Sequence, residues 1–429
     1  MRIVSIVLFF IIILVAPVQA QLEISSPGLQ TIPLALTRFL PLDENIRPEI
    51  AEEINQVLAA NLEFSGLFDL VDPEAFLDDA ETLGLLSIDV EFGQWMLLGA
   101  ETLVKGAYSV RGDKLVIEAR LFDVNRRRLS SGRRYVGQLK DLRRIVHTFS
   151  DEILKAVTGF EGPFNSRIAY VSNRTGSKEI YLMDSDGYND TRLTDHRNIA
   201  LNPDFSGDGR NIIFTSYKQG NPDLYRKELA SGSEISISKR KGLNVTARYR
   251  PGGDEIGLTL SRSGNTEIYL IDAKGKINSR LTDSWGIDIN PSWAPDGEQF
   301  AFMSDRQGNP HIFIAEVGDE SARRLTRQGK YNATPAWNPK NERIAFSRLQ
   351  GGTFDLYTIK SDGSDERRLT FGAGNKEHPR WSPDGRFIVY SSDQSGQKAI
   401  YMMREDGTGS RRVSPPGGAA QHPAWSPRR

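Results

Sequence analysis

From Ile168 onward the chain repeats one pattern with a spacing of 44 residues, and this repeat constrains the fold more than any other feature. One aromatic column with this spacing consists of Tyr181, Tyr225, Tyr269, Phe313, Tyr357 and Tyr401. A second, equally spaced, consists of Phe205, Tyr249, Trp293, Trp337, Trp381 and Trp425. An aliphatic column in phase with both consists of Leu193, Ile237, Leu281, Leu325, Leu369 and Val413. Six copies of one supersecondary unit are therefore expected.

Each unit contains short extended segments, which are clearest in residues 287–326. In this copy the four segments lie at residues 291–293, 300–303, 312–315 and 324–326. Between the first two, Pro295-Asp296-Gly297 predicts a tight turn, because proline sets φ and glycine supplies a positive φ. A period of about 40 to 45 residues with four strands per unit is typical of a β-propeller blade. The repeat therefore predicts an all-β six-bladed propeller with four strands per blade.

The order of the segments predicts how the ring closes. The repeats begin with the second strand type at Ile168 and end with the first strand type at Ala424-Trp425. The C-terminal strand is therefore expected to complete the first blade, which removes the free edge that an open sheet would present to solvent. Because every blade must bury one face against its neighbour, we expect the aromatic columns in the blade cores and not at ligand-stacking sites.

The two rims of the propeller are expected to differ. In an antiparallel meander the tight turns fall on one rim and the longer loops on the other, and loops on a rigid scaffold commonly carry function. Three residues before the second aromatic column lies a polar ring, formed by Asn202, Thr246, Asn290, Thr334, His378 and His422. These side chains either cap backbone groups around a wet tunnel or bind a partner. A metal site at His378 and His422 is disfavoured, because no carboxylate shares the ring.

Residues 21–160 lack the repeat and read as a mixed α/β domain. One helix is expected to start near Pro48 and stop near Gly66, and three strands near residues 103–110, 114–123 and 128–135 follow. A second amphipathic helix is expected to bury Leu142, Ile145, Val146, Phe149 and Ile153. The predicted fold is thus an α/β N-terminal domain over residues 21–160 and a propeller over residues 161–429.

The first 20 residues have the pattern of a secretory signal peptide. Arg2 precedes an apolar run at residues 3–15, and Val18-Gln19-Ala20 resembles a cleavage site. An apolar run of this length is shorter than the roughly 20 residues that span a bilayer. We therefore expect cleavage after Ala20, export of the chain and no direct insertion into the membrane.

Composition argues against several function classes. The formal net charge is −1, which provides no electrostatic attraction for nucleic acid. The chain contains no cysteine and only five histidines, which leaves few residues for thiolate chemistry or a zinc site. No cofactor is expected.

The repeat motifs resemble a known family. The units approximate Pro-x-Trp-Ser-Pro-Asp-Gly, Ile-Ala-Phe-x-Ser, Ile-Tyr-x-x-Asp-x-Asp-Gly and Arg-Leu-Thr. Together with the α/β domain and the chain length, they resemble the TolB family, periplasmic components of the Tol-Pal system, over essentially the whole chain after residue 20. Residues 250–254 and 338–341 depart from the Ser-Pro-Asp-Gly motif, so turn geometry is expected to differ there.

The resemblance implies a monomeric, non-enzymatic scaffold that supports outer-membrane integrity and constriction during cell division. Its propeller mouth would receive the peptidoglycan-associated lipoprotein Pal, and its N-terminus would engage TolA. The residues expected at the Pal-binding mouth are Asn202, Asn244, Thr246, Asp288, Asn290, Asn332, Thr334, Lys376, Glu377, His378 and His422. The segment expected to dock on TolA consists of Gln21, Leu22, Glu23, Ile24, Ser25 and Ser26.

The alternative is a periplasmic propeller enzyme, peptidase-associated or lyase-type, that acts at the central tunnel. A peptidase of this kind would need a Gly-x-Ser-x-Gly nucleophile elbow, and the sequence contains none. A tunnel lyase would need several clustered histidines or carboxylates, and only His378 and His422 qualify. The residues therefore favour the scaffold over the enzyme.

Overall fold

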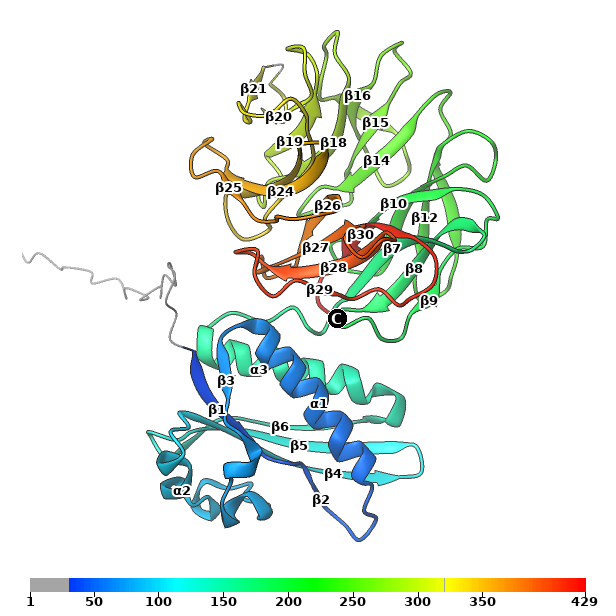
Figure 1. The fold of residues 1–429 in the computed structure, drawn as a ribbon. Helices are drawn as coiled ribbons and strands as arrows, with labels where there is room; N and C mark the ends of the chain where they lie inside the picture. Colours follow the sequence, from blue (N-terminus) through cyan, green and yellow to red (C-terminus); the bar gives the residue numbers. More distant parts are fainter. Residues whose placement is uncertain (1–30, 320) are drawn as a thin grey trace, which may run out of the picture.

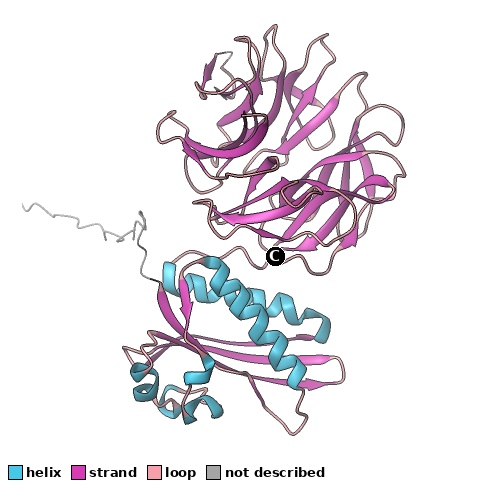
Figure 2. Ribbon diagram, in the orientation of Figure 1, coloured by secondary structure: helices cyan, strands magenta, loops and turns pink. Residues whose placement is uncertain are grey.

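The computed structural model describes residues 31–319 and 321–429, which form an α/β domain followed by a β-propeller (Figure 1). The expected signal peptide and the expected TolA-docking segment lie outside the described residues. Figure 2 shows that all helices of the described chain belong to the first domain and that the second is built of strands. In the described part of the chain, no helix combines the length and the hydropathy needed to cross a membrane.

The first domain is a mixed sheet covered by helices on both faces. Its strands are β1 (Ile32–Leu36), β2 (Leu40–Pro41), β3 (Phe68–Leu70), β4 (Thr102–Arg111), β5 (Lys114–Asp123) and β6 (Arg128–Gln138). Its α-helices are α1 (Pro48–Ser65), α2 (Phe92–Leu97) and α3 (Leu142–Thr158). Its 3-10 helices are η1 (Pro73–Ala75), η2 (Asp78–Glu81), η3 (Ser87–Asp89) and η4 (Leu139–Asp141). The strand order is β3-β1-β4-β5-β6, with β2 paired to β4.

The helices predicted from periodicity are confirmed. Helix α1 starts at Pro48, where the missing N–H breaks no helical hydrogen bond, and ends before Gly66, whose φ of 72° is readily adopted only by glycine. All five residues expected on the buried stripe of α3 are buried. α1 and α3 pack on one face of the sheet and α2 on the other.

The propeller has six four-stranded antiparallel blades, as predicted. The first blade consists of β30 (Ala420–Trp425), β7 (Arg167–Thr175), β8 (Ser177–Asp184) and β9 (Thr191–Arg192). The second consists of β10 (Ala200–Phe205), β11 (Asn211–Ser216), β12 (Asp223–Glu228) and β13 (Glu234–Ser238). The third consists of β14 (Asn244–Tyr249), β15 (Ile256–Leu260), β16 (Glu267–Ile271) and β17 (Ile277–Arg280).

The remaining blades have the same order from the inner to the outer strand. The fourth consists of β18 (Asp288–Trp293), β19 (Gln299–Ser304), β20 (His311–Glu316) and β21 (Ala322–Arg324). The fifth consists of β22 (Asn332–Trp337), β23 (Arg343–Gln350), β24 (Thr353–Lys360) and β25 (Arg367–Arg368). The sixth consists of β26 (Lys376–Trp381), β27 (Phe387–Ser392), β28 (Ala399–Arg404) and β29 (Arg411–Arg412).

The C-terminal strand closes the ring, as the segment order predicted. β30 pairs antiparallel with β7, with Trp425 opposite Ile168. The indole Nε1 of Trp425 donates to Ser166 Oγ at 2.7 Å, which joins the two ends of the propeller. The first aromatic column is buried in the blade cores, which confirms its predicted packing role.

The α/β domain contacts the rim of the propeller that carries the tight turns. The Phe64 ring stacks on Phe387 with 5.1 Å between centroids, and Arg404 Nε donates to the Phe64 carbonyl at 2.9 Å. Asp186, in the turn after β8, accepts a hydrogen bond from Arg143 Nη2 at 2.6 Å. Phe387 and Arg404 belong to the sixth blade and Asp186 to the first, so the domain bridges the two blades where the ring closes (Figure 1).

The opposite rim is the loop rim, defined by the connections from second to third strand and from outer to inner strand, such as residues 217–222 and 239–243. The α/β domain leaves this rim uncovered (Figure 1).

Deletion of residues 420–429 should abolish cooperative unfolding of the propeller. The deletion removes the inner strand of the first blade and exposes the unpaired edge of β7. Circular dichroism melts and size-exclusion chromatography should show aggregation or a broad transition. Deletion of residues 427–429 alone keeps β30 and should remain cooperative. A soluble monomer with unchanged Tm after the longer deletion would contradict the closure.

Candidate binding site in the propeller tunnel

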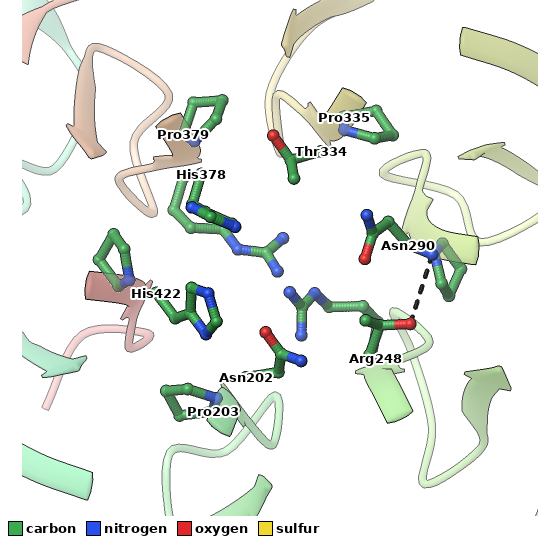
Figure 3. Close-up of a pocket in the computed structure, with 13 residues that line it drawn as sticks. Asn202, Pro203, Arg248, Asn290, Thr334, Pro335, His378, Pro379 and His422 are labelled. Carbon is green, nitrogen blue, oxygen red and sulfur yellow. Dashed lines mark hydrogen bonds between the residues drawn. The ribbon is translucent and has the colours of Figure 1, made fainter. Parts of the chain in front are cut away.

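The six residues of the polar ring occupy one equivalent place in the six inner strands. Each sits third in its strand, and the hydrogen-bonding register between inner and second strand shifts there. All six have a left-handed backbone, with φ between 50° and 59°. A bulge of this kind bends the strand and re-aims a side chain. The structure thus brings the ring together as predicted (Figure 3).

The residue after each ring position is compatible with the bulge. In β10, Leu201 pairs with Thr215 and Asp204 with Ile213, so Asn202 and Pro203 are left outside the regular ladder. Proline has no N–H to donate, so this unpaired position suits it. Proline occupies the equivalent place in five of the six blades, and Ala247 takes it in the third. All six inner strands therefore carry the same bulge.

The ring residues line a cavity of about 180 Å³. Two arginines that were not among the predicted residues, Arg248 and Arg380, line it as well. Each lies two residues after a ring position, Thr246 and His378 respectively. A further 44-residue column two residues after the ring could have identified them: Asp204, Arg248, Ser292, Ala336, Arg380 and Ala424.

The two histidines of the ring lie side by side, with 4.3 Å between ring centroids. Burial lowers the pKa of His378 to about 4, although the nearby Glu377 acts in the opposite direction. Burial and the neighbouring His378 also hold the pKa of His422 well below its ordinary value. Both imidazoles are therefore neutral near pH 7. Within residues 31–319 and 321–429 no group of three or more His, Cys, Asp or Glu side chains could hold a metal ion.

Four other residues expected at the mouth are buried at the start of the inner strands: Asn244, Asp288, Asn332 and Lys376. Asp288 Oδ2 accepts from Arg306 Nη2 at 2.5 Å, and Asn332 Oδ1 accepts from Arg348 Nε at 2.7 Å. Lys376 Nζ donates to the carbonyls of residues 371, 372 and 373 at 2.9–3.0 Å. The structure therefore gives these four side chains internal partners, and they anchor the loops of the rim. Glu377 is partly exposed and pairs with Lys398 at 2.6 Å.

Exposed apolar side chains that were not among the predicted residues lie on the loop rim. They lie in the connections between successive blades: Ile199, Leu243, Trp285, Ile287 and Phe371. Trp285 is 76% exposed and Phe371 is 67% exposed. Large aromatic side chains left in solvent on one rim are typical of a protein-binding surface. The arrangement offers hydrogen-bond donors in the tunnel and apolar anchors around it.

Comparisons with known proteins agree with this architecture. The sequence matches the TolB amino-terminal domain over residues 20–129 and the TolB beta propeller domain over residues 154–429. The Tol-Pal system protein TolB of Syntrophotalea carbinolica is 58% identical over 212 residues, 49% of this chain and 49% of the relative. That of Geobacter sulfurreducens is 42% identical over 190 residues, 44% of this chain and 43% of the relative. The chain thus spans about half the length of the curated relatives it matches.

A solved structure extends the similarity to both domains. The crystal structure of TolB from Acinetobacter baumannii superposes with a TM-score of 0.81 at 26% identity, covering 93% of this chain and 97% of that one.

Thr334→Asn should leave the free energy of unfolding unchanged or raise it by about 0.5–1 kcal/mol. A β-branched residue is strained at positive φ, whereas asparagine tolerates it, and asparagine already occupies the equivalent positions 202 and 290. The variant loses the bond between Thr334 Oγ1 and Ser347 Oγ, which limits the gain. The reverse change, Asn290→Thr, should lower stability. Urea denaturation measures both, and a loss above about 1 kcal/mol for Thr334→Asn would show that strain does not dominate there.

Proposed function

The chain belongs to the TolB family of the Tol-Pal system, and from this premise we propose that it is a periplasmic, non-enzymatic scaffold. In this proposal the loop rim of the propeller binds a Pal-type peptidoglycan-associated lipoprotein, and the N-terminal segment binds TolA. The scaffold thereby supports outer-membrane integrity and envelope constriction during cell division.

One observation supports the loop rim most directly, namely the exposure of Trp285 and Phe371 on the rim that the α/β domain leaves uncovered. Aromatic residues of this kind commonly contribute most of the binding free energy of an interface. The loops that carry them are held by buried polar anchors, so the surface is largely formed before a partner arrives. A preformed surface loses little conformational entropy on binding.

The ring residues support the same face in a different way. Asn202, Asn290 and Thr334 are partly exposed at the cavity and can donate or accept hydrogen bonds. Polar groups that an apolar surface encloses favour a partner with matching hydrogen-bonding groups, because a buried donor without an acceptor is costly. The aromatic rim would then supply affinity and the polar ring specificity.

The N-terminal docking site rests on the sequence of residues 21–26. Leu22 and Ile24 alternate with polar neighbours, and Pro27-Gly28 separates the segment from the domain. A segment with this alternation can add as a strand to the edge of a partner sheet, where main-chain hydrogen bonds give affinity and alternate side chains give specificity.

Trp285→Ala should weaken binding of the soluble domain of the lipoprotein by about tenfold or more, because truncating an aromatic anchor of an interface can cost about 1.4 kcal/mol or more. Phe371→Ala should act in the same direction. Tm should stay close to the wild-type value, since both side chains are exposed. Isothermal titration calorimetry measures the affinity.

Ile235→Ala is the matched control, because Ile235 is 46% exposed on the outer strand β13, away from the loop rim. It should leave the affinity unchanged. Equal weakening by Ile235→Ala, or none by Trp285→Ala, would place the interface elsewhere.

Deletion of residues 21–26 should abolish binding of TolA and leave binding of the lipoprotein intact. A direct titration with the purified C-terminal domain of TolA measures this. The double change Leu22→Ser and Ile24→Ser should reproduce the loss if alternate side chains are read, whereas Ser25→Ala should not. Unaltered affinity of the deletion protein for TolA would refute the docking role.

A further inference from the structure

Two arginines reach into the tunnel, and the fold gives them few partners. The side chain of Arg248 is 14% exposed, and its Nη1 donates to the carbonyl of the adjacent Ala247 at 2.7 Å. Its Nε is buried and has no hydrogen-bond partner among the described residues. Figure 3 shows the Arg248 side chain extending toward the centre of the cavity, past Asn202 and Asn290.

The charges around the cavity do not cancel. Asp204 Oδ1 lies 3.8 Å from Arg248 Nε, and the other oxygen of the same carboxylate accepts from Tyr249 N at 3.0 Å. For Arg380, no carboxylate lies within ion-pair distance anywhere in the described ranges. Of the two guanidinium groups, only that of Arg248 has a carboxylate within ion-pair distance.

Other titratable groups near the tunnel do not supply the missing negative charge. Glu377 acts on His378, but Lys398 pairs with this carboxylate. The positive charges of Lys178, Lys398 and Arg248 act on His422, whose imidazole is neutral near pH 7. The tunnel thus carries an excess of one positive charge or more.

The repeat itself shows that the blade does not require arginine at this position. The equivalent residues in three other blades are Ser292, Ala336 and Ala424, and their inner strands carry the same bulge. Placing a charged group in a confined cavity is unfavourable unless it is paired or solvated. Two such groups at positions where alanine suffices indicate a role in binding.

We propose that the tunnel is a binding site for a small oxyanion, a carboxylate or phosphate group, held by the guanidinium groups of Arg248 and Arg380. Guanidinium presents paired N–H donors that match the oxygens of both groups. Neutral imidazole N–H groups of His378 and His422 and the amides of Asn202 and Asn290 can donate further hydrogen bonds. The cavity of about 180 Å³ has room for roughly six water molecules, enough for one such group with part of its hydration. The site requires no protein partner.

Titration of the chain from residue 21 with sodium phosphate, and separately with sodium acetate, tests the proposal by calorimetry at constant ionic strength. The wild-type protein should bind at least one of the two anions with a stoichiometry near one, and its Tm should rise with the concentration of that anion. Arg380→Gln should weaken this binding by about tenfold or more, because a charge-assisted hydrogen bond is removed. Arg248→Gln should do the same, and the double variant should not bind.

Arg380→Gln is the decisive variant, since it breaks no ion pair in the described structure and its Tm without anion should match the wild type. Arg197→Gln is the matched control, because Arg197 is 88% exposed on the loop rim and its loss changes the net charge equally. Failure of wild type to bind either anion overturns the proposal, as does equal weakening by Arg197→Gln and Arg380→Gln.

A competition experiment distinguishes a free anion from an acidic side chain of a protein partner. If a partner's carboxylate enters the tunnel, the bound anion should compete with the lipoprotein in wild type and not in Arg380→Gln. If the natural ligand is a free anion, the affinity for the lipoprotein should be independent of it. Either result is consistent with an anion site in the tunnel. If Trp285→Ala loses lipoprotein binding but still binds the anion, the anion site and the proposed interface are distinct.

Discussion

Pairing of the C-terminal strand β30 with β7 is the interaction on which the rest of the structure depends. The ladder from Ala420–Ser172 to Trp425–Ile168 joins residues more than 240 positions apart in the sequence, and the six blades depend on it to form a ring. Closure pairs the inner edge of β7, so each blade packs against two neighbours and only the short outer strands keep a free edge. The absence of cysteine makes this closure more important, because no disulfide can hold the ends of the propeller together.

The six bulges show how a repeated fold acquires a site. At each ring position a left-handed residue followed, in five blades, by proline turns a side chain out of the ladder and toward the axis. Left-handed backbone at a β-branched residue such as Thr246 is strained, and the surrounding sheet maintains it. The distortion is common to all blades, whereas the side chains differ. Variation at two positions per blade is therefore enough to set the chemistry of the whole tunnel.

Most of the fold could be predicted from the sequence because the 44-residue period is itself a physical signal of stacked blades. The polar ring was also predictable, since it keeps a constant offset from an aromatic column. Arg248 and Arg380 were not found, although they belong to a column of their own two residues after the ring. A register shift lies beside them, so strand alternation alone does not show that they share the cavity with the ring. The burial of Asp288 and Lys376 depends on Arg306 and on loop carbonyls, which are tertiary partners that local sequence does not reveal. Short helices between residues 73 and 97 and the position of the α/β domain likewise follow from long-range packing.

The contact between the α/β domain and the propeller has a mechanical consequence. The domain contacts Phe387 and Arg404 on the last blade and Asp186 on the first. It therefore spans the seam of the ring, the place where β30 pairs with β7. A docking surface split in this way is complete only after the ring has closed. A pull on the N-terminal side of the molecule is transmitted to that seam, the joint whose strands are separated most in sequence. The domain thus holds the first and last blades together. Tension strong enough to detach the domain would loosen the ring at the same place.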